Sequence, residues 1–162
     1  MATDMFLELK GVEGESIDKV YKDKKAMDIL AWSWGMSNSG SFHSGSGGGS
    51  GKANVQDLSF TKHIDKASAP LMLACCNGKH FDEAVLTVRK AGEKPLEYLK
   101  ITMTEVIVTS VSTGGSGGED RLTENVALNF AKVKTEYFMQ NKAGGKETGG
   151  QMSWDIAANA NE

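Results

Sequence analysis

The sequence predicts a mainly β fold, and two observations support this. Alternating apolar and polar residues recur through the second half of the chain, and they predict strands at 84–90, 96–112, 122–139 and around 152–156. One segment carries clear helix signals, because Ser68, Ala69 and Pro70 form a typical start and Gly78 a typical stop. A length of 162 residues fits one core. We therefore expect a single domain over residues 1–162.

The first third of the chain predicts two strands separated by a charged segment. Residues 5–9 alternate between apolar and polar side chains, whereas residues 13–28 are rich in charge and are expected to form a solvated loop. The side chains of 26–36 divide by parity into a bulky set and a mostly small set, which are Leu30, Trp32, Trp34 and Met36 on one side and Ile29, Ala31, Ser33 and Gly35 on the other. Such a small face is unusual on a strand unless another chain or a cavity lies against it.

Three glycine-rich segments are expected to be mobile loops, at about 37–52, 112–121 and 141–150. The first has almost no side chain that can join a core, and a connection of this length tends to be functional or to order on assembly. A strand is expected to follow it at 55–61, with Leu58 and Phe60 on one face.

The expected helix is apolar on all sides, so it is predicted to pack against a sheet. It contains Cys75 and Cys76, which are adjacent and therefore poorly placed to form a disulfide with each other. We interpret them as two small apolar residues of a buried helix, with metal binding or thiol reactivity as the alternative. Farther along, the apolar parity of 122–139 shifts after Phe130, which predicts a bulge near Ala131 that bends the strand.

The catalytic motifs that occur in the sequence lack their required context. Residues 45–52 resemble a phosphate-binding loop, but Ser46 stands where its first glycine is needed and Ala53 where its hydroxyl residue is needed, and a strand is expected after them. Residues 114–118 have the spacing of a hydrolase nucleophile elbow, yet the three histidines all precede them. Ser59 and Lys62 have a penicillin-binding-enzyme spacing that needs a helix. We expect no enzymatic activity, no cofactor and no metal site.

Composition excludes several classes of partner. The net charge of −3 gives no basic field for nucleic acid, and no apolar run approaches the length of a membrane span. The first ten residues contain acids where a signal peptide needs basic and apolar regions. The protein is therefore expected to be made in the cytoplasm, without a cleaved signal peptide and without membrane insertion.

Three stretches together resemble Hcp, the haemolysin-coregulated protein family of the bacterial type VI secretion system. They are residues 30–37, 55–62 and 112–126. The resemblance implies a small barrel of two antiparallel sheets with one short helix, assembled as a hexameric ring around a channel. It further implies that rings stack into an inner tube, that a contractile sheath and baseplate proteins drive the tube out behind a VgrG-type spike, and that small effector proteins travel in the channel and are protected there.

Two groups of residues are expected to act in such a tube. Ala31, Ser33 and Gly35 share the small face of their strand and are expected to line the channel and contact cargo, with the subunit interface as the alternative. The exposed polar loops are expected to make weaker contacts between rings. Their members are Ser44, Gly47, Gly48, Gly49, Gly115, Gly117, Glu119, Asp120 and Arg121.

Two rival interpretations remain open from sequence. The first is a small-molecule-binding β-barrel carrier or enzyme, which needs an interior pocket with polar groups. Bulky apolar residues are instead expected inside and would fill a small barrel; they are Trp32, Trp34, Leu58, Phe60, Leu128 and Phe130. The second is a secreted lectin or adhesin, which the missing signal peptide and the lack of distant cysteine pairs disfavour.

Overall fold

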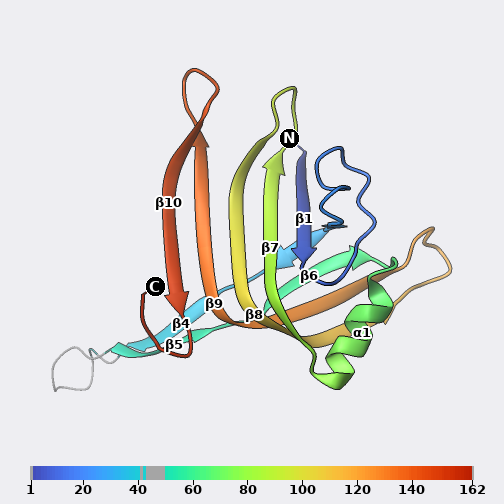
Figure 1. Ribbon diagram of the computed structural model, residues 1–162, viewed down its shortest axis with the longest axis horizontal. Helices are drawn as coiled ribbons and strands as arrows, with labels where there is room; N and C mark the ends of the chain where they lie inside the picture. Colours follow the sequence, from blue (N-terminus) through green and yellow to red (C-terminus); the bar gives the residue numbers. More distant parts are fainter. Residues whose placement is uncertain (1, 41, 43–49, 162) are drawn as a thin grey trace.

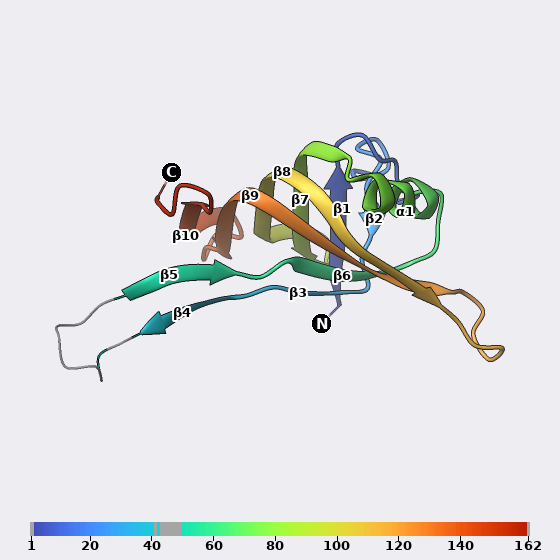
Figure 2. The ribbon, with the colours of Figure 1, turned by 90° about the horizontal axis from the view of Figure 1, so that it is seen from below.

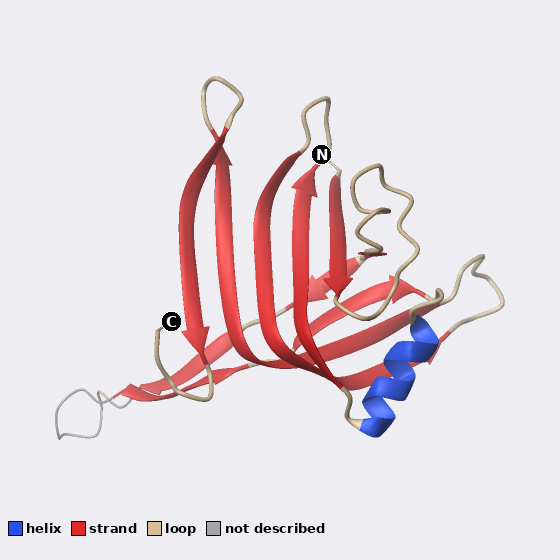
Figure 3. Ribbon diagram, in the orientation of Figure 1, coloured by secondary structure: helices blue, strands red, loops and turns tan. Residues whose placement is uncertain are grey.

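Strands make up most of the structure, a computed structural model that describes residues 2–40, 42 and 50–161 (Figure 3). The elements in chain order are β1 (Thr3–Leu9), β2 (Met27–Asp28), β3 (Ala31–Ser33), β4 (Met36–Gly40), β5 (Ser50–Val55), β6 (Leu58–His63), α1 (Ser68–Asn77), β7 (His80–Lys90), β8 (Leu96–Gly114), β9 (Thr123–Gln140) and β10 (Lys146–Asp155). Within the described residues no helix is both long and apolar enough to span a membrane.

All strand pairs are antiparallel, and they form two sheets. The larger sheet has the order β2-β1-β7-β8-β9-β6-β3, with β10 pairing on β9, and the smaller sheet is the hairpin β4–β5. The long strands β8 and β9 bend, so that β7 pairs with one half of β8, β10 pairs with the same half of β9, and β6 pairs with the other half of β9 (Figures 1 and 2). The predicted fold class of two antiparallel sheets with one short helix is confirmed.

The bend in β9 lies where the sequence places it, but its cause differs from the prediction. Burial changes parity between Phe130 and Val133, as expected. The register across this point is continuous, from Thr104 opposite Lys132 to Val106 opposite Phe130, so the predicted bulge near Ala131 is wrong. The irregularity lies instead on β8, where Glu105 adopts a positive φ of 56° and the register shifts after Val108.

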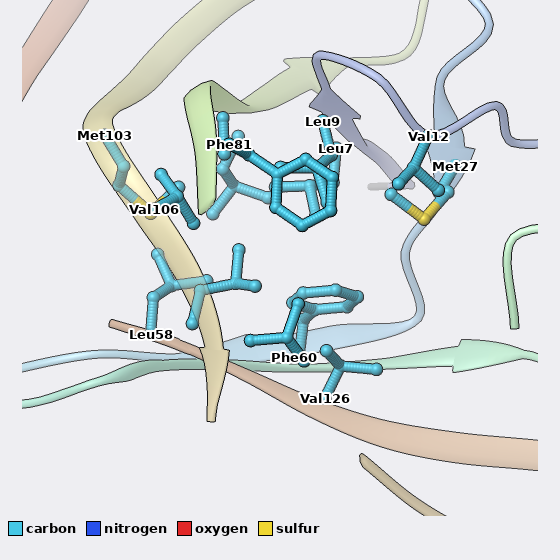
Figure 4. Packing of buried hydrophobic residues seen from close by; sticks show 14 of the residues in the cluster. Leu7, Leu9, Val12, Met27, Leu58, Phe60, Phe81, Met103, Val106 and Val126 are labelled. Atoms are coloured by element: carbon cyan, nitrogen blue, oxygen red, sulfur yellow. The ribbon is translucent and has the colours of Figure 1, made fainter. Parts of the chain in front are cut away.

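The core fills the space between the two halves of the bent sheet (Figure 4). Of the six residues expected inside, Leu58, Phe60, Leu128 and Phe130 are buried, and Trp32 and Trp34 are half-buried at the edge of the same cluster. Leu7 from β1 and Met103 from β8 pack into it from the other half. The expected apolar interior is therefore confirmed.

The charged segment 13–28 is not the solvated loop that its composition predicts. Tyr21 is buried, stacks on Phe6 with ring centroids 4.0 Å apart, and donates a hydrogen bond to Glu97 at 2.5 Å. Arg89 fastens the segment by donating to Asp18 at 2.5 Å and lies over the Phe6 ring. This hydrogen bond from Arg89 holds the pKa of Asp18 at about 2, below its usual value. The packing of Tyr21 and the hydrogen bond from Arg89 therefore hold this segment against the sheet in spite of its charged residues.

The expected strand over 26–36 is interrupted. It forms β2, β3 and the start of β4, and the buried parity changes along it. Ile29 is buried and Leu30 is exposed, so Leu30 does not share the inward face of Trp32. The cause is the change of partner, because β2 pairs with β1 whereas β3 pairs with β6.

All three expected loops are shorter than predicted. Strands β4 and β5 occupy both ends of 37–52, β8 continues to Gly114, and β10 begins at Lys146. Glycine and serine are poor strand formers, but in a hairpin the ladder of backbone hydrogen bonds does not depend on side chains. A glycine- and serine-rich sequence therefore indicates that few side chains pack here, and it does not exclude strands.

The helix begins and ends as predicted, with Gly78 in a left-handed conformation donating to Ala74 O at 2.9 Å. Its burial is one-sided, contrary to the expectation for an all-apolar helix. Ser68, Leu71 and Ala74 face the sheet, whereas Cys75 is half-buried and Cys76 is exposed. The interpretation of two buried cysteines is therefore wrong for Cys76.

Candidate assembly and channel surface

Two rows of small side chains cross four neighbouring strands on the outer side of the bent sheet. The strand register places Ser33 opposite Ser59, Ser59 opposite Ala127 and Ala127 opposite Ser110. The second row runs in the same way and consists of Ala31, Thr61, Asn125 and Ser112. All eight residues are exposed or half-buried, and none is charged. We call this set the small polar face.

The intervening row explains why the small polar face exists. Trp32, Phe60, Val126 and Val111 stand opposite one another in the same strands and point toward the core. Side chains alternate between the two sides of a strand, so the bulky row fixes which residues face outward. A shift of register by one residue would exchange the two rows.

The structure brings two of the three expected channel residues together. Ala31 and Ser33 lie in β3 and belong to the small polar face. Gly35 lies beyond the end of β3 and is half-buried, and its carbonyl accepts a hydrogen bond from Gln56 N at 2.9 Å. A Cβ at Gly35 would come within 3.3 Å of Gln56 Oε1, so this position serves the turn toward β4.

Sequence reasoning missed a hydrogen-bonded cluster beside this face. The carboxylate of Asp57 accepts hydrogen bonds from Thr109 Oγ1 at 2.7 Å and from Asn129 Nδ2 at 2.8 Å. On the second row, Thr61 Oγ1 donates to Asn125 Oδ1 at 2.6 Å. The available signal was the alternation Asn125, Ala127, Asn129 between apolar residues in β9. These hydrogen bonds order the polar side chains and link β6 to β9, and the residue before β6 to β8 and β9.

The loop residues expected to join rings are only partly described. Gly115, Gly117, Glu119, Asp120 and Arg121 are exposed in the loop between β8 and β9. Ser44, Gly47, Gly48 and Gly49 lie outside the described residues. The β8–β9 loop and the strands β4 and β5 lie at opposite ends of the long axis (Figures 1 and 2).

A buried ion pair anchors the base of the β8–β9 hairpin. Lys62 and Glu124 have side chains that are 0% exposed and form a salt bridge of 2.5 Å. Lys62 also contacts Asp65 at 2.8 Å, and Ser68 donates to Glu124 at 2.7 Å. The network ties the start of α1 to β6 and β9, because Ser68 opens the helix. Among the described residues, no group of histidine, cysteine and acidic side chains could hold a metal ion.

The fold and the small polar face define a class of protein before any comparison. A core filled with side chains and a broad neutral sheet face suit a subunit that acts through its surface. The sequence model described as "Type VI secretion system effector, Hcp" matches residues 6–137, and the chain belongs to this family. The expected resemblance is confirmed.

Individual relatives agree over nearly the whole chain. Protein hcp1 of Pseudomonas aeruginosa is 60% identical over 162 residues, which is 98% of each chain. Among solved structures, Hcp1 from Salmonella typhimurium is 39% identical with a TM-score of 0.78, and the match covers 100% of both chains. A structure described as a type six secretion system protein has a TM-score of 0.91 at 30% identity, covering 99% of this chain and 100% of the other.

Proposed function

We propose that this chain is the repeating subunit of a type VI secretion inner tube, in which hexameric rings stack around a channel lined by the small polar face. The family membership supports the secretion role. The observation that carries the channel assignment is the pair of neutral rows across β3, β6, β9 and β8, since a surface of small uncharged side chains binds varied cargo weakly and lets it slide.

Ring closure is supported by the edges of the strands that carry this face. In the described residues, β3 ends the strand order of the sheet, and β7 pairs with β8 only as far as Ile107. The two sides of the face therefore end in strand edges with unpaired backbone groups, which favour pairing with another chain. Head-to-tail contacts of this kind close into rings when the rotation between copies allows it.

Light scattering on the purified protein tests the assembly. A mass near six chains, together with particles that show a central opening by negative stain, is the expected result. A monomer with a ligand-binding interior would support the rival carrier.

The secretion role predicts that the exported protein keeps its N-terminus. Mass spectrometry of the protein in the culture medium checks this, and a shortened chain would contradict export without a cleaved signal peptide.

The channel assignment is tested by Ser33→Gln. Ring mass should be unchanged, because Ser33 is exposed, and cargo co-purifying with the rings should fall severalfold as the longer side chain crowds the wall. Thr148→Gln, an exposed change in β10 away from the face, is the matched control. Rings that dissociate on Ser33→Gln would assign the face to the subunit interface instead.

Ring stacking is assigned to the exposed β8–β9 loop, with the glycine-rich loop near 44–49 as its expected counterpart. Glu119, Asp120 and Arg121 are exposed charges and favour contacts that salt weakens. Reversing Glu119 and Asp120 to lysine should shorten tubes while leaving single rings at their original mass. Tubes of unchanged length at low salt would remove this loop from the stacking contact.

The remaining partners follow from the same assignment. They are a VgrG-type spike, sheath and baseplate proteins, and small effectors in the channel, without nucleic acid, cofactor, catalysis or membrane insertion. If effectors bind the channel wall, wild-type rings should pull down more effector protein than rings carrying Ser33→Gln.

A further inference from the structure

The inward side chains of β6 and β9 include one pair of opposite charges. Phe60 and Val126 stand opposite each other and pack in the core (Figure 4). The next inward pair along the two strands is Lys62 opposite Glu124. Both charged side chains are 0% exposed and form a salt bridge. An apolar row therefore ends in two charges that folding has to remove from water, which is costly.

The hydrogen bonds of this pair are incomplete. The ammonium group of Lys62 lies within hydrogen-bond distance of four oxygens and is fully paired. Glu124 Oε1 accepts from both Lys62 and Ser68, but Glu124 Oε2 is buried and has no hydrogen-bond partner among the described residues. An unpaired buried oxygen opposes stability, and a well-packed apolar pair is often as stable as a buried ion pair. Stability alone therefore does not explain these charges.

Alternation of side chains specifies the pairing of β6 with β9 only in part. A slip by one residue would turn the apolar row outward, so alternation excludes it. A slip by two residues keeps every side chain on its own side of the sheet. In one direction Phe60 would move from Val126 to Leu128, which is also apolar and buried. Beyond the charges, Ile64 and Leu122 continue the apolar parity of the two strands. The apolar pattern does not distinguish these registers.

The two charges do distinguish them. In one slipped register Lys62 would stand opposite Val126, and in the other Glu124 would stand opposite Phe60. Separating a buried ion pair in this way disfavours a register by more than about a hundredfold. The hydrogen bonds on the outward side discriminate less, because they are exposed and water can replace a lost partner.

We propose that the salt bridge between Lys62 and Glu124 selects the register of β6 against β9 among the alignments that alternation allows. The selection acts on the small polar face, because β3 pairs with β6 and follows it. A slip by two residues would move β3 by about 6–7 Å along the sheet. It would also part Thr61 from Asn125. The register belongs to a single subunit, so this inference does not depend on the proposed ring.

Cysteine pairs on the outward side report the register directly, in a background where both native cysteines are replaced by serine. Thr61→Cys with Asn125→Cys reports the native register, and Thr61→Cys with Ala127→Cys or with Thr123→Cys reports the two slipped registers. Directly opposite residues lie about 5 Å apart and diagonal neighbours about 7–8 Å apart, whereas a disulfide needs Cα atoms within about 7 Å. Efficient cross-linking therefore identifies the residues that stand opposite each other.

The measurement follows refolding. Each protein is unfolded with a reductant, refolded and oxidised, and disulfides within one chain are identified by peptide mass mapping. With Lys62 and Glu124 present, the cysteines at 61 and 125 should be the ones that link. With Lys62→Met and Glu124→Leu together, the share of molecules with a slipped link should rise at least about tenfold, because no buried charge then disfavours the slipped registers.

A matched control separates loss of register from loss of stability. Val126→Ala weakens the same strand pair but keeps both charges, so it should give the native link. If the protein with Lys62→Met and Glu124→Leu does not refold, Lys62→Gln with Glu124→Gln replaces it and should raise the slipped links too.

The outcomes separate this inference from the proposed function. Native links alone in the proteins without the two charges would overturn the register role, and so would an equal rise of slipped links in Val126→Ala. Wild-type protein that remains monomeric at every concentration overturns the ring and leaves the register role standing.

Discussion

The two faces of the strands β3, β6 and β9 differ in chemistry although they alternate residue by residue. The inward row contains Trp32, Phe60 and Val126, and the outward row contains Ser33, Ser59 and Ala127. The inward row supplies the apolar burial that stabilises the fold. The outward row contributes little to stability and is free to serve assembly or cargo. One set of strands thus places its stabilising side chains and its exposed small side chains on opposite sides by parity alone.

The largest expected effect is on the inward row. Phe60→Ala should reduce the free energy of unfolding by about 3–5 kcal/mol, because the ring is buried and its loss leaves a cavity. Ser59→Ala, one residue away on the outward row, should change it by less than about 0.5 kcal/mol. Urea unfolding at one fixed protein concentration measures both. Equal destabilisation by the two variants would contradict the division of roles.

The next effect concerns the only lysine on the inward side of β6. Lys62→Met should cost about 3 kcal/mol, because it leaves Glu124 buried without its cation. The double variant Lys62→Met with Glu124→Leu should recover part of that loss, since the buried charge of Glu124 is gone while Asp65, which is partly exposed, keeps its hydrogen bond from Ala67 N. A double-mutant cycle by urea unfolding measures the coupling. Additive losses would show that the two side chains do not depend on each other.

The smallest effect is expected for a hydrogen bond on the outward side. Thr61→Val removes the bond to Asn125 while keeping the shape of the side chain, and should cost no more than about 1 kcal/mol. Thermal unfolding at fixed protein concentration measures this change. A loss as large as that of Phe60→Ala would mean that the small polar face is itself structural.

The sequence predicted much of this surface, for identifiable reasons. Alternation in 26–36 correctly separates Ser33 from Trp32, and alternation in 58–60 correctly buries Phe60. Asp57, Thr109 and Asn129 were missed because their hydrogen bonds join residues 52 and 72 positions apart. Cys76 was misplaced because composition alone cannot tell which side of a short apolar helix is covered.

The sequence by itself determined the mainly β class, the bounds of the helix and the family, because these depend on local alternation, local start and stop signals and the motifs of three separate stretches. Tertiary structure alone decided which strands stand side by side, and so which small residues form continuous rows. It also decided that Tyr21 and Arg89 hold down a charged segment, and that α1 leaves one apolar side exposed. Burial depends on what lies opposite a side chain, and that partner is usually distant in the sequence.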